Sequence, residues 1–135
     1  MTCTFCDIIE EHSMGYIIYQ DLETTAFLDR SPVVKGHVLV VPNAHILEIT
    51  KCDPQTLGSL MVVVKKVAQC QRAALKASGN LIFNNNVIGQ SVAHLHFHVV
   101  PRSNHDGYRA SSSPSLKYES QQQMQYYREI LGASI

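Results

Sequence analysis

The chain has 135 residues, with 11 Lys and Arg against 11 Asp and Glu and a formal net charge of zero. This length predicts one domain, large enough to bury a core. The balanced charge gives no basic excess to favour nucleic acid as a partner, and no apolar run reaches the ~18 residues of a membrane span. The N-terminus lacks the basic start and long apolar stretch of a secretory signal, so we expect a cytoplasmic or nuclear protein.

The first part of the chain predicts three short strands. Residues 16–19 and 25–28 flank a polar turn at residues 20–23, which is typical of a hairpin. Residues 37–41 follow Gly36, are rich in β-branched side chains and end at Pro42. This pattern predicts a buried strand.

The clearest helix begins at Asp53-Pro54. Asp can cap the free N–H groups of a first turn, and Pro suits the first helical position. Apolar side chains then recur largely at three- and four-residue steps, which predicts one core-facing stripe. The stripe consists of Leu57, Leu60, Met61, Val64, Val67, Ala68 and Leu75. Gly79 is the predicted C-terminal cap.

The second half predicts two more strands and a second helix. Residues 80–83 and 92–100 are the strand candidates, separated by a polar loop at residues 84–90. Residues 103–115 are rich in Ser, Gly and Pro and are typical of a linker, and residues 116–131 predict a weaker helix. Five strands with one long central helix predict an α+β domain.

Three histidines alternate with apolar residues in the last predicted strand: His94, His96 and His98. Successive side chains of a strand point to opposite faces, so all three histidines should line one face. A core strand has no use for three imidazoles, because each carries polar nitrogens that need partners. Two interpretations remain open at this point. The imidazoles hold a metal, or one is a nucleophile in phosphoryl transfer and another assists it.

The cysteines fall into two kinds. Cys3 and Cys6 form a C-x-x-C pair, whereas Cys52 and Cys70 are isolated. In a reducing compartment, a close pair is more often metal-binding or redox-active than a structural disulfide. Cys70 lies inside the predicted long helix and is expected to be a small core residue.

The segment around the histidines resembles the signature of the histidine triad (HIT) family. The matching run is His94-Leu95-His96-Phe97-His98-Val99-Val100, with Gly89-Gln90-Ser91-Val92 before it and Pro101-Arg102 after it. Residues 4–9, 26–29 and 36–42, followed by His45, match in order and spacing. The resemblance implies a HIT-like fold, a five-stranded antiparallel sheet with one long central helix and a C-terminal helix. We therefore expect a HIT domain over residues 1–107, with residues 108–135 as linker and C-terminal helix in the same compact unit.

The resemblance also implies a reaction. The family's middle histidine is a nucleophile, so His96 would attack the α-phosphate of a purine nucleotide derivative and form a covalent nucleotidyl intermediate. Dinucleoside polyphosphates and nucleoside phosphoramidates are the implied substrates of this hydrolase or transferase. His98 would contact a phosphate oxygen and help the leaving group, and Ser91 would hydrogen-bond near the scissile bond.

A nucleotide site follows from the same resemblance. Asp29 matches the family's ribose-binding position, and an acidic side chain can accept hydrogen bonds from both sugar hydroxyls. His37 matches a histidine that supports the triad. The loop from Asn84 is one residue shorter than the common family form. Either Asn84 or Asn85 could therefore match the family's asparagine that helps hold the sugar-phosphate. The expected contacts of the nucleotide are Phe5, Ile8, Leu28, Asp29, Asn84, Gly89, Ser91, Val92, His96 and His98.

The resemblance further implies a structural zinc ion, as in many microbial HIT proteins. Its ligands would be Cys3, Cys6, His45 and His94, and two thiolates with two imidazoles suit tetrahedral zinc. His94 would then be a ligand and not a catalyst. No organic cofactor is expected, and the family implies a homodimer.

Two alternatives to the enzyme remain. The same pocket could bind a purine nucleotide with little turnover and regulate a partner, or the histidine row itself could be the metal site. The branch of the family also stays open. Residues 30–34 and Pro101-Arg102 look like the branch that cleaves diadenosine polyphosphates, whereas His45 and the cysteine pair look like the microbial branch.

Overall fold

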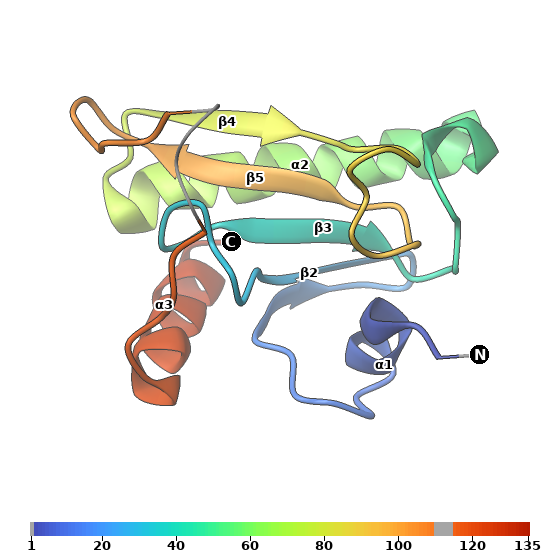
Figure 1. Cartoon of the computed structure of the whole chain (residues 1–135), viewed down its shortest axis with the longest axis horizontal. Coiled ribbons are helices and arrows are strands. Elements are labelled where there is room, and N and C mark those ends of the chain that lie inside the picture. The colour runs from blue at the N-terminus through green and yellow to red at the C-terminus, as the bar shows by residue number, and fades with distance from the viewer. Residues whose placement is uncertain (1, 110–114) are drawn as a thin grey trace.

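A five-stranded antiparallel sheet forms the centre of the computed structural model, which describes residues 2–109 and 115–135 (Figure 1). The strands are β1 (Ile17–Gln20), β2 (Thr24–Leu28), β3 (Val38–Pro42), β4 (Gly79–Phe83) and β5 (Phe97–Arg102). They lie in the order β1-β2-β3-β5-β4, and every neighbouring pair is antiparallel. The sheet confirms the expected α+β class and the predicted hairpin between β1 and β2.

The helices cover both faces of this sheet. They are α1 (Thr4–Ile9), the 3₁₀ turn η1 (Ile49–Lys51), α2 (Pro54–Leu75) and α3 (Gln121–Ser134). The long helix α2 runs behind the sheet in Figure 1, and α3 packs against α2 and β1. None of the helices in the described ranges combines the length and apolar character needed to cross a bilayer.

Strand alternation divides the apolar residues between two cores. Ala26 and Leu28 of β2 turn toward α2 and α3 and join the larger core. Phe27, between them, turns to the other face, where Phe5 and Ile8 of α1 complete a smaller core. The period-two geometry of a strand explains this division, and the smaller core fixes α1 on the face that carries the histidines.

Helix α2 starts as predicted but ends earlier. Asp53 accepts a hydrogen bond from the Thr56 N–H at 2.9 Å, and Pro54 is the first helical residue. The helix stops at Leu75, where Lys76 takes up the left-handed conformation with φ 58°. The prediction of Gly79 as the cap is therefore wrong, because Gly79 is the first residue of β4.

The predicted last strand is also too long at its start. Strand β5 begins at Phe97, so His94 and His96 lie in an irregular segment that precedes it. The assignment of faces is nevertheless confirmed, since Leu95, Phe97 and Val99 lie in the larger core. Helix α1 escaped prediction because six residues are too few for a periodic apolar pattern.

The C-terminal helix begins later than predicted. Ser120 caps α3 by accepting the Gln123 N–H at 3.0 Å, so residues 116–119 are not helical. Residues 115–119 run instead beside the loop that precedes β3, where the Leu116 N–H donates to the Pro32 carbonyl at 2.8 Å. Of the predicted linker at residues 103–115, residues 110–114 lie outside the described ranges.

Gly36 should be intolerant of a side chain. Its φ is +95°, and a Cβ there would lie 2.4 Å from Cδ1 of Leu75. We expect Gly36→Ala to lower the free energy of unfolding by about 1–3 kcal/mol, through strain and overpacking. Gly58 of α2 is the matched control, because a Cβ there meets nothing within 4 Å. Gly58→Ala should raise stability by about 0.5–1 kcal/mol. Urea denaturation measures the free energy of unfolding of both variants. Equal changes in the two would contradict the strain and overpacking expected at Gly36.

Candidate active site and metal centre

His96 has one ring nitrogen bound and one free. The ring is buried, with 2% of the residue exposed, and its Nδ1 lies 2.7 Å from the His94 carbonyl oxygen. A carbonyl only accepts, so this hydrogen bond assigns the proton of the neutral ring to Nδ1. In the described ranges, every fully buried side-chain nitrogen has a hydrogen-bond partner. Nε2 of His96 has none there, so this atom is not fully buried and reaches the surface. His96 therefore presents a lone pair on Nε2.

The surroundings of His96 keep the ring neutral. Burial lowers its pKa, while the hydrogen bond to His94 and the Asp29 carboxylate raise it, and burial prevails. A neutral ring near pH 7 retains its lone pair. The Asp29 carboxylate nonetheless favours positive charge at His96. That charge is what the ring would acquire on bonding to phosphorus.

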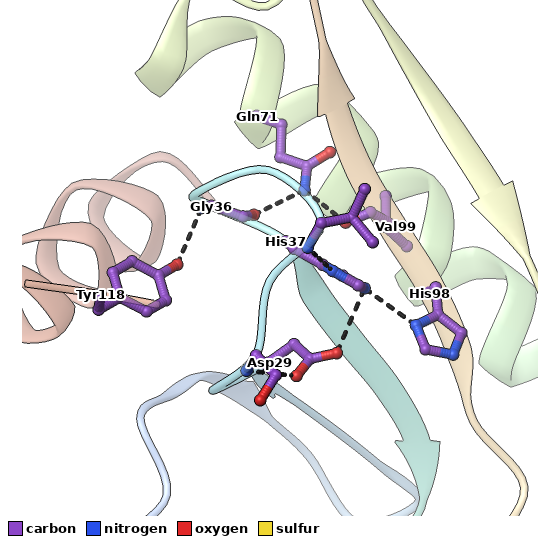
Figure 2. A network of polar contacts seen from close by, with 9 residues as sticks. Asp29, Gly36, His37, Gln71, His98, Val99 and Tyr118 are labelled. Atoms are coloured by element: carbon purple, nitrogen blue, oxygen red, sulfur yellow. Dashed lines mark hydrogen bonds and ion pairs between the residues drawn. The ribbon is translucent and has the colours of Figure 1, made fainter. Parts of the chain in front are cut away.

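His98 is aligned by a chain of two hydrogen bonds. The Val33 N–H donates to Nδ1 of His37 at 3.0 Å, which assigns the proton of His37 to Nε2. This Nε2 lies 2.9 Å from Nδ1 of His98 and donates to it (Figure 2). The proton of His98 is therefore on Nε2. His98 can donate a hydrogen bond from that atom.

Burial keeps both of these rings neutral. It lowers the pKa of His37 to about 3, assisted by the charges of His98 and His96. It lowers the pKa of His98 to about 4, assisted by His96. Asp29 Oδ2 lies 3.6 Å from Nε2 of His37, and because that ring is neutral the contact is not an ion pair. The Phe83 ring stacks on His98 with centroids 4.1 Å apart, which fixes its plane.

Phe5 connects His96 with an apolar cavity of about 320 Å³. Its ring lines the cavity, and its centroid lies 5.0 Å from that of His96. Phe5, Ile8 and Val92, three of the expected nucleotide contacts, line the cavity together with Asp29, Arg30 and Ser31. Asp29 accepts the Ser31 N–H at 2.9 Å, and burial raises the pKa of its carboxyl. A cavity of this size suits a planar heterocycle.

Leu28 contributes less to this cavity than the resemblance implied. It borders the cavity, but it packs in the larger core on the other face of the sheet. Phe27 and Leu39 face the cavity instead, and neither was predicted as a site residue. The alternation of β2 contained the signal, since Phe27 and Asp29 are two residues apart and share a face.

The loop between β4 and β5 holds the backbone of His96. The Asn84 side-chain amide donates to the His96 carbonyl at 2.8 Å, and its oxygen accepts from Asn86. Asn85 instead lies next to Gly89, whose φ of +75° turns the loop. Asn84 is thus the one of the two asparagines that contacts His96.

Ser91 lies apart from the triad. It is exposed and borders a second cavity together with Cys3 and His45. Among the hydrogen bonds of the described ranges, none joins Ser91 to His96 or His98. Its expected role at the scissile bond stays a prediction.

Four side chains from distant parts of the chain form a second cluster. These are Cys3, Cys6, His45 and His94, whose candidate ligand atoms all lie within 4.8 Å of one another. The Cys3 Sγ–His94 Nδ1 and Cys6 Sγ–His45 Nδ1 distances are both 3.4 Å, and the two Nδ1 atoms are 3.2 Å apart. A tetrahedron with zinc–ligand bonds of 2.0–2.3 Å has edges of about 3.3–3.8 Å. The donor set and its spacing are therefore compatible with zinc.

The orientation of His94 agrees with a ligand role. Its Nε2 lies 2.9 Å from the Pro42 carbonyl oxygen, which can only accept. The proton is then on Nε2, and Nδ1 faces the sulfur atoms with a free lone pair. Such a hydrogen bond behind a metal-binding imidazole is the usual arrangement.

The three histidines of the motif do not form one ligand set. In the described ranges, His94 groups with the cysteines and His45, and His98 groups with Asp29 and His37. His96 belongs to neither group. The interpretation of the histidine row as a single metal site is therefore wrong, because the row supplies three different environments.

Comparison with known proteins identifies the family. The HIT domain model matches residues 11–105. An uncharacterized HIT-like protein of Saccharolobus solfataricus is 34% identical over 131 residues, which cover 96% of this chain and 94% of that protein. The chain belongs to the HIT family.

Two solved structures are similar over nearly the whole chain. A hypothetical histidine triad nucleotide-binding protein from Sulfolobus tokodaii has a TM-score of 0.88 and 34% identity, covering 98% of this chain and 91% of its own. A Zn-bound histidine triad family protein from Mycobacterium smegmatis has a TM-score of 0.88 and 31% identity, covering 99% and 93%.

The neutral histidines predict loss of stability in acid. Unfolded histidines take up protons below about pH 6.5, whereas folded His98 stays neutral to about pH 4. The unfolded chain then binds more protons, so the free energy of unfolding falls as the pH falls through this range. We expect urea denaturation to show this between pH 7 and 5. In His98→Asn the decline should be shallower by up to about 1.4 kcal/mol per pH unit. Wild type and His98→Asn both keep the cysteine–histidine cluster, so the effects of acid on that cluster cancel. Identical slopes of unfolding free energy against pH would contradict the lowered pKa of His98.

Proposed function

We propose that this HIT protein is a hydrolase or transferase that cleaves at the α-phosphate of a purine nucleotide derivative. The observation that carries the proposal is the hydrogen bond from Nδ1 of His96 to the His94 carbonyl. It leaves the Nε2 lone pair of a neutral imidazole without a partner, and the Phe5 ring that contacts this imidazole also lines a cavity that suits a base. Positioning and charge stabilisation are the main requirements of phosphoryl transfer.

In the first step, Nε2 of His96 attacks the α-phosphorus and the bond to the leaving oxygen or nitrogen breaks. The His96 ring becomes cationic, and both the His94 carbonyl and the Asp29 carboxylate favour that charge. His98 donates from Nε2 to a phosphate oxygen or to the leaving atom, where negative charge develops. Water or another hydroxyl acceptor then attacks phosphorus and releases a proton to solvent, the P–N bond breaks and His96 returns to its neutral form.

The nucleoside part of the substrate has its own contacts in this proposal. The base enters the cavity lined by Phe5, Ile8 and Phe27. The carboxylate of Asp29, which also lines the cavity, accepts from the ribose hydroxyls. Val92 and Gly89 belong to the loop that would border the phosphate. Dinucleoside polyphosphates and nucleoside phosphoramidates both place an α-phosphate between such a base and a leaving group.

A second function uses the same pocket without turnover. The Sulfolobus tokodaii relative is described as nucleotide-binding. A regulatory module that binds a purine monophosphate would need the cavity and Asp29, but not the lone pair of His96. The two functions differ in their dependence on His96.

We also propose that the second cluster binds one structural zinc ion through Cys3, Cys6, His45 and His94. The Zn-bound relative supports this assignment. Four protein ligands would leave no open position, so the ion would cross-link these segments and would not take part in catalysis. His94 connects the two sites, because its ring would hold the metal while its carbonyl holds Nδ1 of His96.

A homodimer is the expected assembly. Strand β4 lies at an edge of the sheet, and Ile82 on it is 46% exposed. An unpaired edge strand with an exposed isoleucine can pair with a second copy about a twofold axis.

Replacement of His96, the proposed nucleophile, tests the proposed enzymatic activity. We expect His96→Ala to lower kcat/KM by at least about 10³-fold, because a covalent route loses its attacking atom. A panel of diadenosine polyphosphates and adenosine phosphoramidate, scored by release of adenosine monophosphate, measures the effect. Intact mass spectrometry of rapidly quenched wild type should show the adenylyl adduct. His12→Ala, an exposed histidine, is the control.

Two results would count against this proposal. Unchanged turnover in His96→Ala would exclude the covalent route. Tight binding of adenosine monophosphate by wild type, with no turnover across the panel, would establish the binding module instead.

Zinc content tests the cluster. Cys6→Ser should lower bound zinc from about one ion per chain to nearly none, because one thiolate of the tetrahedron is lost. Elemental analysis after gel filtration measures the stoichiometry. Cys52→Ser, a cysteine outside the cluster, and His96→Ala should keep the metal. Zinc retained in Cys6→Ser but lost in His96→Ala would overturn the assignment.

A further inference from the structure

A buried glutamine joins the two histidines that align the leaving-group side of the site. Gln71 of α2 is fully buried, and its Nε2 donates to the Gly36 carbonyl at 3.0 Å and to the Val99 carbonyl at 2.8 Å. Gly36 directly precedes His37, and Val99 directly follows His98 (Figure 2). One side-chain amide thus bridges the backbone next to both members of the pair.

This bridge lies where the ladder between β3 and β5 ends. The register of the two strands includes Val38 opposite Val99 but does not extend to Gly36. The Gly36 carbonyl lies outside the ladder, and the Gln71 amide supplies its donor. The Gln71 oxygen accepts from Nδ2 of Asn80 at 2.6 Å, so the buried amide is satisfied on both sides. A buried amide with this pattern is directional, whereas an apolar residue of equal size would remove the donor of the Gly36 carbonyl.

A tyrosine holds the other side of Gly36. The Gly36 N–H donates to the Tyr118 hydroxyl at 2.9 Å, as Figure 2 shows. Burial raises the pKa of Tyr118 to about 12, so the phenol stays neutral. Its ring packs edge-on against Tyr127 of α3, with centroids 5.6 Å apart. Tyr118 lies beyond residues 11–105, the part of the chain that the family model covers.

The two contacts restrain the turn from which His37 projects. Gly36 has a φ of +95°, and glycine alone does not restrict rotation there as a side chain would. Gln71 and Tyr118 hold the peptide groups on both sides of this residue. Rotation of either peptide would move the His37 ring, whose Nε2 must stay 2.9 Å from Nδ1 of His98 to assign its proton.

We propose that Gln71 and Tyr118 are positioning residues, which hold His37 against His98 and so keep the proton of His98 on Nε2. Neither residue touches the cavity or the reacting atoms. The structural part of this inference is independent of the proposed function, and only its kinetic consequence rests on it.

The ring nitrogen shifts of His98 test the structural part directly. We expect ¹⁵N NMR of wild type to show a single tautomer of His98, protonated on Nε2. Tyr118→Phe removes only the hydroxyl, and Gln71→Met removes only the amide; both should give a mixture of the two tautomers. Gln69→Met on α2 and Tyr126→Phe on α3, both at exposed positions, should match wild type. An unchanged tautomer in folded Tyr118→Phe would overturn the proposal, even if Gln71→Met fails to fold.

Kinetics on two leaving groups test the consequence. A hydrogen bond from His98 matters most when the leaving atom is basic. Tyr118→Phe should therefore lower kcat about five- to tenfold for an adenosine alkylphosphoramidate, roughly the loss of one aligned hydrogen bond, with little change in KM. A nitrophenyl ester of adenosine monophosphate, whose leaving group is stable as an anion, should be little affected.

The same kinetics distinguish a positioning role of Tyr118 from general damage to the fold. Equal losses of kcat on both substrates would indicate general damage and overturn the proposal. In a His37→Gln background, Tyr118→Phe should have no further effect on kcat, because the connection it supports is already broken. Absence of turnover in wild type would defeat the proposed function, while the tautomer measurement would still decide the role of Gln71 and Tyr118.

Discussion

The register between β3 and β5, in which Leu39 lies opposite His98 and Val38 opposite Val99, is the constraint on which both faces of the molecule depend. It turns Val38 and Val99 toward α2, where they close the larger core. It also brings the ring of His37 to the ring of His98 on the opposite face. A slip of one residue would exchange these faces and place an imidazole against α2. Core packing therefore enforces the geometry of the site.

The site consists of neutral imidazoles whose protons are assigned by neighbouring groups. The His94 carbonyl accepts a hydrogen bond from Nδ1–H of His96. The Val33 N–H donates to Nδ1 of His37 and so leaves the proton of that ring on Nε2, where it faces His98. Burial favours the neutral rings and so preserves the lone pairs on which these assignments depend. In a more solvent-exposed site the rings would take up protons and donate from both nitrogens. No single tautomer would then be fixed, and no lone pair would remain. The fold thus provides one lone pair, on Nε2 of His96, and one aligned donor, on Nε2 of His98.

Local patterns predicted much of this architecture because their causes are local. Asp53-Pro54 marks the start of α2 through hydrogen bonds within one turn. The alternation around His96 assigned its neighbours to the correct faces, since the geometry of an extended chain needs no distant partner. The predicted cap at Gly79 was wrong because Lys76 took the left-handed position three residues earlier. Helix α1 was missed because its apolar face, Phe5 and Ile8, is buried only by packing against Phe27 of β2, which no local pattern within α1 indicates.

The sequence by itself determined the family and the α+β class and indicated His96 as the candidate nucleophile, because a specific motif and short-range periodicity lie in consecutive residues. Only the tertiary structure decided how the three histidines are divided, since His94 meets Cys3 across 91 positions of chain. The same is true of the cavity wall at Phe27 and of the contacts that Gln71 and Tyr118 make with Gly36. Such contacts depend on how helices and strands pack, and a buried glutamine in an amphipathic helix shows its role only when the carbonyls opposite it are known.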